Sequence, residues 1–164
     1  WMMGDVESVF AKMTTALADV ETEDTAIVTL KFKSGALGII EATTATRPTN
    51  LEGSISILGE NGTVVIGGVA VNEMQTWVFE DEQEGDSVVL EEFSVNPPNV
   101  YGFGHQAYYE HVVDCVVNES ANLVDGLQGR KSIELISAIY ESAETGKEVF
   151  LKFQPKHCRL GQKS

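Results

Sequence analysis

Apolar and polar residues alternate with a period of two through the first half of the chain, and this pattern limits the fold more than any other feature. Between Asp24 and Lys33 one side of the pattern is apolar and the other carries threonine and lysine. Because successive side chains of a strand point to opposite faces of a sheet, the alternation predicts a half-buried strand. Ser34-Gly35 then predicts a tight turn into a second arm, residues 36–44, which is rich in β-branched residues.

More strands are expected before residue 94. Their predicted ranges are 51–58, 63–66, 74–79 and 88–93. The first two flank Asn61-Gly62, a pair that is typical of hairpin turns. The acidic loop 80–86 joins the last two. We interpret it as a solvated hairpin tip, because it lacks the ligand spacing of a calcium-binding EF-hand loop.

The pattern becomes helical after Pro97-Pro98, since a double proline does not fit within a central strand. One helix is predicted over 105–118. A second helix is predicted from the capping residue Asp125 to Glu144, with Gly146 just past its end. The residues expected on its buried stripe are Leu135, Ile136, Ile139, Tyr140 and Ala143.

A last strand is predicted over 148–153, where apolar residues again alternate. Strands followed by two helices and a strand indicate an α+β fold: a predominantly antiparallel open sheet with two helices packed on one face. The length of 164 residues suits a single domain, 1–164, in which 154–164 forms a disordered tail. The other face of the sheet carries more aliphatic residues than a solvent-exposed face usually does, which favours an interface with another subunit or domain.

Composition excludes several classes of function. The 25 acidic residues outnumber the 11 basic ones and leave a net charge of −14, which would repel the phosphate backbone of a nucleic acid. No apolar run reaches the roughly 20 residues needed to cross a bilayer, so no membrane role is expected. Two cysteines, Cys115 and Cys158, do not make a disulfide framework, so a reducing, cytoplasmic setting is expected.

Five segments resemble, in the same order, the second domain of the Gfo/Idh/MocA oxidoreductases. They are Trp1–Val9, Asp24–Gly38, Gly59–Thr63, Gly104-His105 and Ser142–Lys147. Each segment is short, but the ordered set covers nearly the whole chain. No helix start or cap precedes Trp1, so the chain is expected to begin within an element.

This resemblance implies a domain that, in the family, follows an amino-terminal Rossmann domain for NAD or NADP. The chain corresponds to the carboxy-terminal half only, and the family's catalytic histidine and lysine are expected in the missing upstream part. The resemblance therefore predicts the substrate-binding and oligomerisation domain of an NAD(P)-dependent sugar or nucleotide-sugar dehydrogenase, inactive by itself. No catalytic, cofactor-binding or metal-binding residue is expected in this chain.

The partners that the resemblance implies are the missing Rossmann domain, a sugar-type small molecule and further copies of the chain. The copies would form a homodimer or homotetramer through the open sheet face. An alternative from another class is a non-catalytic sugar-binding or dimerisation module.

Four residues are candidates for contact with the substrate. His105 follows a glycine-rich connection and either meets an anionic group near the backbone amides of a helix start or is an ordinary helix-start residue. Arg47 precedes Pro48 on a loop, so its fork of donors either meets a phosphate or carboxylate or is solvated. Tyr101 and Tyr109 either stack on a sugar or are half-buried.

Two other patterns point to different chemistry. Residues 102–107 match the G-x-G-x-x-A dinucleotide fingerprint, but Pro97-Pro98 stands where a buried parallel strand is needed. A flexible approach to a helix is therefore the preferred interpretation. His111 and Cys115 are four apart on one helical face, as metal ligands can be. Because His105 lies on a different face and no fourth ligand is evident, packing is preferred there.

Overall fold

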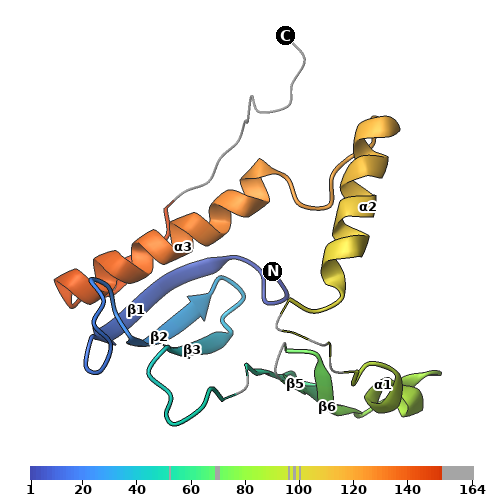
Figure 1. Cartoon of the computed structure of the whole chain (residues 1–164), viewed down its shortest axis with the longest axis horizontal. Coiled ribbons are helices and arrows are strands. Elements are labelled where there is room, and N and C mark those ends of the chain that lie inside the picture. Colours follow the sequence, from blue (N-terminus) through green and yellow to red (C-terminus); the bar gives the residue numbers. More distant parts are fainter. Residues whose placement is uncertain (52, 69–70, 96, 98, 100, 153–164) are drawn as a thin grey trace. The chain divides into compact units, whose positions relative to one another are not determined.

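The structure is a computed structural model (Figure 1). It divides into two compact units. The residues described are 1–51, 53–68, 71–95, 97, 99 and 101–152. The first unit combines Trp1–Arg47 with the chain from Leu123 onward, and the second unit is Pro48–Asn122. Because the second unit lies between the two parts of the first in sequence, it is an insertion into the first.

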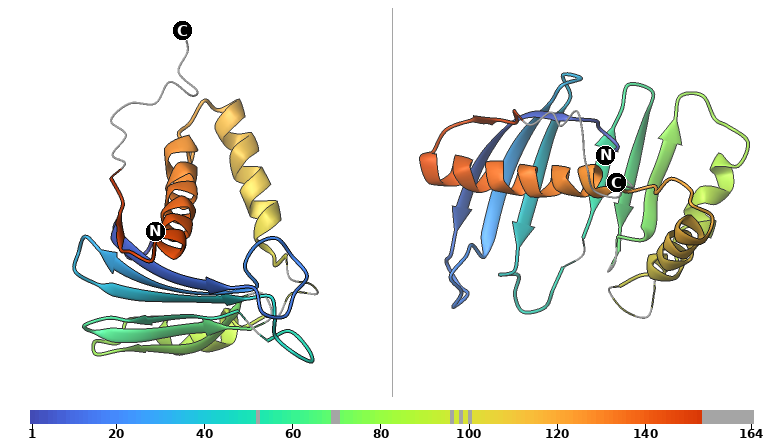
Figure 2. Two further views of the ribbon diagram at one scale, coloured as in Figure 1. Left: turned by 90° about the vertical axis from the view of Figure 1, so that its left-hand side faces the viewer. Right: turned by 90° about the horizontal axis from the view of Figure 1, so that it is seen from above.

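The first unit is a sheet of four antiparallel strands. These are β1 (Val6–Thr14), β2 (Thr25–Phe32), β3 (Leu37–Thr43) and β7 (Val149–Phe150), in the order β3-β2-β1-β7. A helix, α3 (Gly126–Thr145), packs against β1 and β7 and lies across one face of this sheet (Figure 2). The unit is therefore a two-layer arrangement of one sheet and one helix.

The core of the first unit lies between this sheet and α3. In β2 every second residue is buried, as the alternation predicts. The buried cluster consists of Val9, Ala11, Val28, Leu30, Phe32, Ala138 and Ile139. Burying a valine, leucine, isoleucine or phenylalanine side chain contributes roughly 1.5–3 kcal/mol, so the larger members of this cluster stabilise the unit most.

The β1 strand was not among the predicted strands. Phe10 is an apolar residue on the face that should be polar, and Ser8 is buried rather than exposed. The Ser8 hydroxyl donates to the Glu148 carboxylate, a residue far away in sequence. Because this contact is tertiary, no local pattern in the sequence reveals it.

The two ends of α3 agree with the prediction. The Asp125 carboxylate accepts a hydrogen bond from the Gln128 backbone N–H at 2.9 Å and so caps the first turn. Gly146 follows the last turn with a φ of 66°, the left-handed conformation that glycine adopts without a steric penalty. On the stripe, Ile139 is buried, but Ile136 is 53% exposed and Tyr140 is 38% exposed, so the predicted burial of these two is wrong. Ala138 and Ser142 are buried instead, on the side of α3 that packs against β1.

Ser142 connects α3 to β1 inside the first unit. Its side chain is fully buried, and its hydroxyl accepts from the Ala11 backbone N–H at 3.0 Å. The same hydroxyl donates to the Lys147 carbonyl at 2.6 Å. One buried group therefore satisfies two backbone groups from different elements, which would otherwise lose their hydrogen bonds to water without a replacement.

The loop between β1 and β2 is held by Asp24, which is 2% exposed. One carboxylate oxygen accepts from the backbone N–H groups of Ala16, Leu17 and Ala18, at 2.9, 2.6 and 2.9 Å. These donors, with the Leu17 N–H first, lower the pKa of Asp24 to about 2. The loop is therefore fixed by an ionised carboxylate at neutral pH.

The second unit contains a three-stranded antiparallel sheet and two helices. The strands are β4 (Ile55–Leu58), β5 (Gly62–Gly67) and β6 (Glu73–Phe79), in the order β4-β5-β6. The helices are α1 (Asp86–Glu92) and α2 (Gly104–Val117). The turn between β4 and β5 is closed by a 2.8 Å hydrogen bond from the Gly59 N–H to the Gly62 carbonyl, as the Asn-Gly pair predicts.

The predicted strand over 88–93 is wrong, because this segment forms α1. Gly85 turns the chain with a φ of 100°, and the Asp86 carboxylate then accepts from the Trp77 indole N–H at 2.8 Å. These contacts start a helix where the valines alone favour a strand. The loop before α1 is therefore not the tip of a hairpin.

The α+β class and the antiparallel strands are confirmed, but the strands divide into two sheets. The last predicted strand is shorter than expected and covers only Val149–Phe150, and Phe153 and the predicted tail 154–164 lie outside the described residues. None of the helices in the described parts of the chain is both long and apolar enough to span a bilayer.

Candidate functional site

Tyr101 and His105 lie together at the start of α2. The His105 Nδ1 atom is 3.1 Å from the Tyr101 carbonyl oxygen, and the two rings meet edge to face with centroids 6.1 Å apart. Gly102 has a φ of 68° and turns the chain between them. A carbonyl acceptor at Nδ1 favours the tautomer with its proton there, which leaves Nε2 as a hydrogen-bond acceptor.

The turn at Gly102 also belongs to residues 102–107, which match the dinucleotide fingerprint in sequence. That fingerprint requires a strand that leads directly into the glycine-rich turn. Among the residues described between Phe93 and Gly104, none is in a strand. The described residues of this segment therefore have the form of a loop that approaches a helix.

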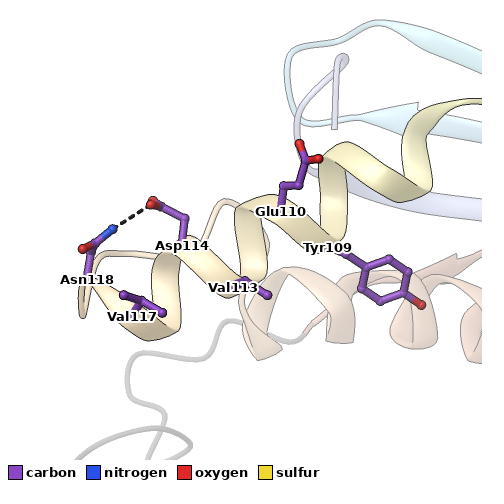
Figure 3. Close-up of a pocket in the computed structure, with 6 residues that line it drawn as sticks. All are labelled: Tyr109, Glu110, Val113, Asp114, Val117 and Asn118. Atoms are coloured by element: carbon purple, nitrogen blue, oxygen red, sulfur yellow. Dashed lines mark hydrogen bonds between the residues drawn. The ribbon is translucent and has the colours of Figure 1, made fainter.

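Tyr109 lies one helical turn beyond His105 and is 64% exposed. It borders an open hollow on the surface of α2, which is lined by Tyr109, Glu110, Val113, Asp114, Val117 and Asn118 (Figure 3). The apolar members are four residues apart and form one stripe, while Asn118 donates to Asp114 at 2.6 Å. A hollow built on a single helix can contact a ligand or a partner but cannot enclose one.

Arg47 is exposed at the end of the first unit's opening segment, on a loop beyond β3 as predicted. Its Nη1 donates to the neighbouring Thr46 carbonyl at 2.9 Å. Among the described residues, no carboxylate is within ion-pair distance of this guanidinium. The group can therefore still offer a fork of donors to an anion.

His111 and Cys115 contact each other on the opposite side of α2. The Cys115 Sγ atom is 3.5 Å from His111 Nε2 and 3.5 Å from the Ala121 carbonyl oxygen. Cys115 is 7% exposed and is a free thiol. The described residues contain no cluster of three or more side chains able to hold a metal ion. The packing interpretation of this pair stays a prediction.

Sequence reasoning missed a second pocket at the end of β6. Its lining residues are Asn61, Trp77, Phe79, Asp81, Gln83 and Asp86. The Trp77 and Phe79 rings pack edge to face with centroids 5.0 Å apart. The Trp77 indole N–H and then the Gln83 backbone N–H lower the pKa of Asp86, so this carboxyl is ionised at neutral pH. The one local signal was a tryptophan close to an acidic run.

Comparison with known proteins assigns the chain to a family. The family model described as "Oxidoreductase family, C-terminal alpha/beta domain", of the Gfo/Idh/MocA type, matches residues 1–151. This chain belongs to the Gfo/Idh/MocA oxidoreductase family. The family resemblance stated from the sequence is confirmed.

Several solved structures of the family are similar to this chain. The WlbA dehydrogenase from Bordetella pertussis, in complex with NADH and UDP-GlcNAcA, is 39% identical with a TM-score of 0.80, over 94% of this chain and 43% of that chain. The WlbA dehydrogenase from Chromobacterium violaceum, with the same two ligands, is 42% identical with a TM-score of 0.82, over 94% and 43%. An oxidoreductase from Agrobacterium radiobacter, 23% identical with a TM-score of 0.69 over 91% of this chain and 44% of that chain, shares the fold.

This chain therefore spans less than half the length of these relatives. It corresponds to the family's carboxy-terminal domain, which makes it a fragment of an oxidoreductase.

Proposed function

We propose that this chain is the substrate-side domain of an NAD(P)-dependent dehydrogenase that acts on a nucleotide sugar. The observation that carries the proposal is the 39% and 42% identity, over 94% of the chain, to two dehydrogenases that bind NADH and UDP-GlcNAcA. A nucleotide sugar acid of this kind offers a diphosphate, a carboxylate and a sugar ring. We therefore expect this chain to bind that class of ligand.

We propose that the cofactor is bound outside this chain. Support comes from the residues described just before α2, none of which lies in a strand, whereas the dinucleotide fingerprint needs a strand that leads into its glycine-rich turn. We assign NAD or NADP to a Rossmann domain elsewhere in the complete enzyme, as the family resemblance implies. The task of this chain is to bind and orient the substrate.

Each candidate residue can supply one kind of contact. The Arg47 guanidinium suits a phosphate or a carboxylate, since its planar fork matches two oxygens at once. The His105 Nε2 atom can accept a hydrogen bond from a sugar hydroxyl, because its Nδ1 atom is already directed at Tyr101. The exposed rings of Tyr101 and Tyr109 can stack on a sugar ring or a base.

Calorimetric titration with UDP-GlcNAcA tests the substrate proposal. If Arg47 contacts an anionic group, Arg47→Ala weakens binding by roughly 10- to 100-fold, because hydrogen bonds to charged groups are worth about 1.5–3 kcal/mol. Lys147→Ala removes one exposed positive charge from the same unit and serves as the control. Equal affinity of the Arg47→Ala variant and the intact chain would contradict the role of Arg47, and no binding to the intact chain would contradict the ligand class.

The proposed inactivity of the chain alone has a separate test. Purified protein is incubated with NAD or NADP and UDP-GlcNAcA, and reduced nicotinamide is followed by its absorbance. We expect no turnover, and we expect turnover once the complete enzyme is assayed in the same way. Turnover by the chain alone would show that the acid–base groups lie within it.

A second role, self-association, is favoured by the sheet face of the first unit that points away from α3. Ile27, Leu37 and Ile39 lie on this face and are 52%, 78% and 76% exposed. Apolar side chains grouped on one face mark interaction sites in soluble proteins. We propose that a second copy of the chain covers this face, giving a homodimer or a homotetramer.

The mass in solution tests this role by light scattering. Ile39→Asp places a charge on the face and should convert the assembly to a monomer, because an unpaired charge is costly in an apolar interface. The matched control is Ile133→Asp, at a 67% exposed position on α3 in the same unit. A monomeric intact chain, or an unchanged mass for Ile39→Asp, would refute the proposal.

A further inference from the structure

The charge of this chain is distributed very unevenly between the two units. The second unit, Pro48–Asn122, carries more than half of the 25 acidic residues and none of the 11 lysines and arginines. Nearly all of the net charge of −14 therefore belongs to this unit, while the first unit is close to neutral. A surface of one sign attracts ligands of the opposite sign.

The pocket at the end of β6 lies within this acidic unit and adds aromatic surface to the charge. Trp77 and Phe79 are both half-buried and line the pocket, and Asp81 lines it from an exposed loop. The Trp77 ring is held in place by the 2.8 Å hydrogen bond to Asp86. The pocket lining therefore combines two aromatic residues, one of them held by a hydrogen bond, with the Asp81 carboxylate.

Gly62, in the hairpin turn between β4 and β5, packs against the Phe79 ring of the pocket. A Cβ atom at this position would collide with the Phe79 ring and with the Val78 carbonyl. The hairpin turn can therefore lie directly against the ring because residue 62 has no side chain. This contact fixes the second wall of the pocket.

We propose that this pocket binds an organic cation of the guanidinium type. The faces of aromatic rings carry negative potential and attract cations, and tryptophan does so most strongly. A guanidinium is planar and weakly hydrated, so it can stack on the ring and present its fork of donors to Asp81. No lysine or arginine of the second unit competes for the site.

The structure argues against other ligands at this position. A phosphate or carboxylate would be repelled by Asp81 and Asp86. A metal ion would need several free oxygen ligands, but both Asp86 oxygens accept hydrogen bonds from Trp77 and Gln83, at 2.8 and 2.7 Å. The site is therefore independent of the anionic nucleotide sugar proposed above, and either proposal can fail without the other.

Indole fluorescence measures binding to this pocket directly. Trp1 is 89% exposed, so Trp1→Phe removes the other tryptophan and leaves Trp77 as the reporter. The probe is acetyl-arginine amide, and its neutral control is acetyl-citrulline amide, which has the same shape without the charge. We expect a saturable change with the first and none with the second. No saturable response, or an equal response to both, would overturn the proposal.

Two variants of the acidic loop test whether the cation binds in the pocket or is attracted only by the overall negative charge of the unit. Asp81→Asn removes a carboxylate that lines the pocket, whereas Glu84→Gln removes one from the same loop that does not. Both side chains are exposed, so both variants should fold. We expect Asp81→Asn to weaken binding roughly two- to fivefold, the range of an exposed ion pair, because the ring contacts remain, and Glu84→Gln to weaken it less than about twofold. Equal effects would overturn the proposal.

The cation can come from a free metabolite or from an arginine of a partner protein, and a tri-arginine peptide distinguishes the two. Tighter, salt-sensitive binding of the peptide relative to acetyl-arginine amide would indicate a basic protein segment, since further arginines would meet the rest of the acidic loop. Equal affinity would indicate a small guanidinium compound. Either result supports a cation site.

Discussion

The two units of this chain differ in what holds them together and in what they leave exposed. The first unit has a continuous buried cluster between its sheet and α3. In the described part of the second unit, the buried residues are only Gly67, Gly68, Pro97 and Cys115. The first unit also balances its charges, with Lys33 and Lys131 both paired to Asp5. The second unit carries no lysine or arginine.

This difference indicates that the first unit mainly stabilises the domain and the second unit mainly provides its binding residues. A unit with a packed core tolerates little change inside, because interiors are close-packed. A unit with few buried side chains keeps its rings and carboxylates available at the surface. Three of the four proposed substrate contacts, Tyr101, His105 and Tyr109, lie in the second unit, as does the proposed cation pocket. We therefore expect stability to depend mostly on the first unit and binding mostly on the second.

The same substitution placed in each unit should give the largest contrast. Leu30 is 8% exposed in the core of the first unit, whereas Leu58 is 79% exposed in β4. Leu30→Ala should lower the free energy of unfolding by about 2–5 kcal/mol, because it leaves a cavity in a packed core. Leu58→Ala should change it by less than about 0.5 kcal/mol. Urea unfolding followed by circular dichroism measures both, and similar losses would contradict the comparison.

A smaller loss in the free energy of unfolding is expected when the buried Ser142 hydroxyl of α3 is removed. Ser142→Ala leaves the Ala11 N–H and the Lys147 carbonyl without their partner, which should cost about 1–3 kcal/mol. Ser137 is exposed on the same helix, and its hydroxyl donates to the Ile133 carbonyl at 2.8 Å. Ser137→Ala should therefore be nearly neutral in the same unfolding experiment. Equal effects would mean that the Ser142 bridge is not needed.

The acid side of the stability curve should depend on Asp24. Its pKa is about 2 in the folded chain, against 3.8 for an ordinary aspartate. Because the folded pKa is depressed, the stabilisation is complete above pH 3.8 and is lost as the pH falls toward 2. Asp24→Asn should lower the melting temperature at pH 6. The melting temperature of this variant should then decrease less than that of the intact chain as the pH falls toward 2. Asp19→Asn, in the same loop, is the control, and matching acid profiles for Asp24→Asn and the intact chain would refute this role.

The smallest effect concerns salt. Like charges in the second unit repel one another, and salt screens them, with a Debye length of about 30 Å at 0.01 M and about 10 Å at 0.1 M. Raising the ionic strength should therefore slow amide hydrogen exchange in β5 and β6 more than in β1 and β2. Mass spectrometry of peptides from each unit checks this. Uniform slowing would show that the charge asymmetry does not affect local stability.

Sequence patterns predicted those parts of the fold that depend on neighbouring residues. The alternation in β2 and both ends of α3 were predicted correctly, because each follows from local geometry. The helix α1 was not, since a contact between Trp77 and Asp86 overrides the strand preference of its valines. The strand β1 was missed for a similar reason, because its buried serine is satisfied by Glu148.

The candidate site shows the same limit. Residue types and helix position suggested His105 and Tyr101 separately, and the structure adds that their rings meet. The pocket of Trp77 and Phe79 had no sequence pattern of its own, because its walls come from a hairpin turn, a strand end and a loop. Such a site becomes visible only when tertiary contacts bring these segments together.

The position of β7 has a consequence for synthesis on the ribosome. β1 pairs with β2 on one side and with β7 on the other, and Ser8 lies opposite Phe150. The nascent chain therefore emerges with β1 to β3 already able to pair, while α3 and β7 are made only after the whole inserted unit. Translation proceeds at about 5–20 residues per second, so the apolar side of this early sheet stays uncovered for several seconds before α3 has been synthesised. During that interval a chaperone has a defined surface to protect.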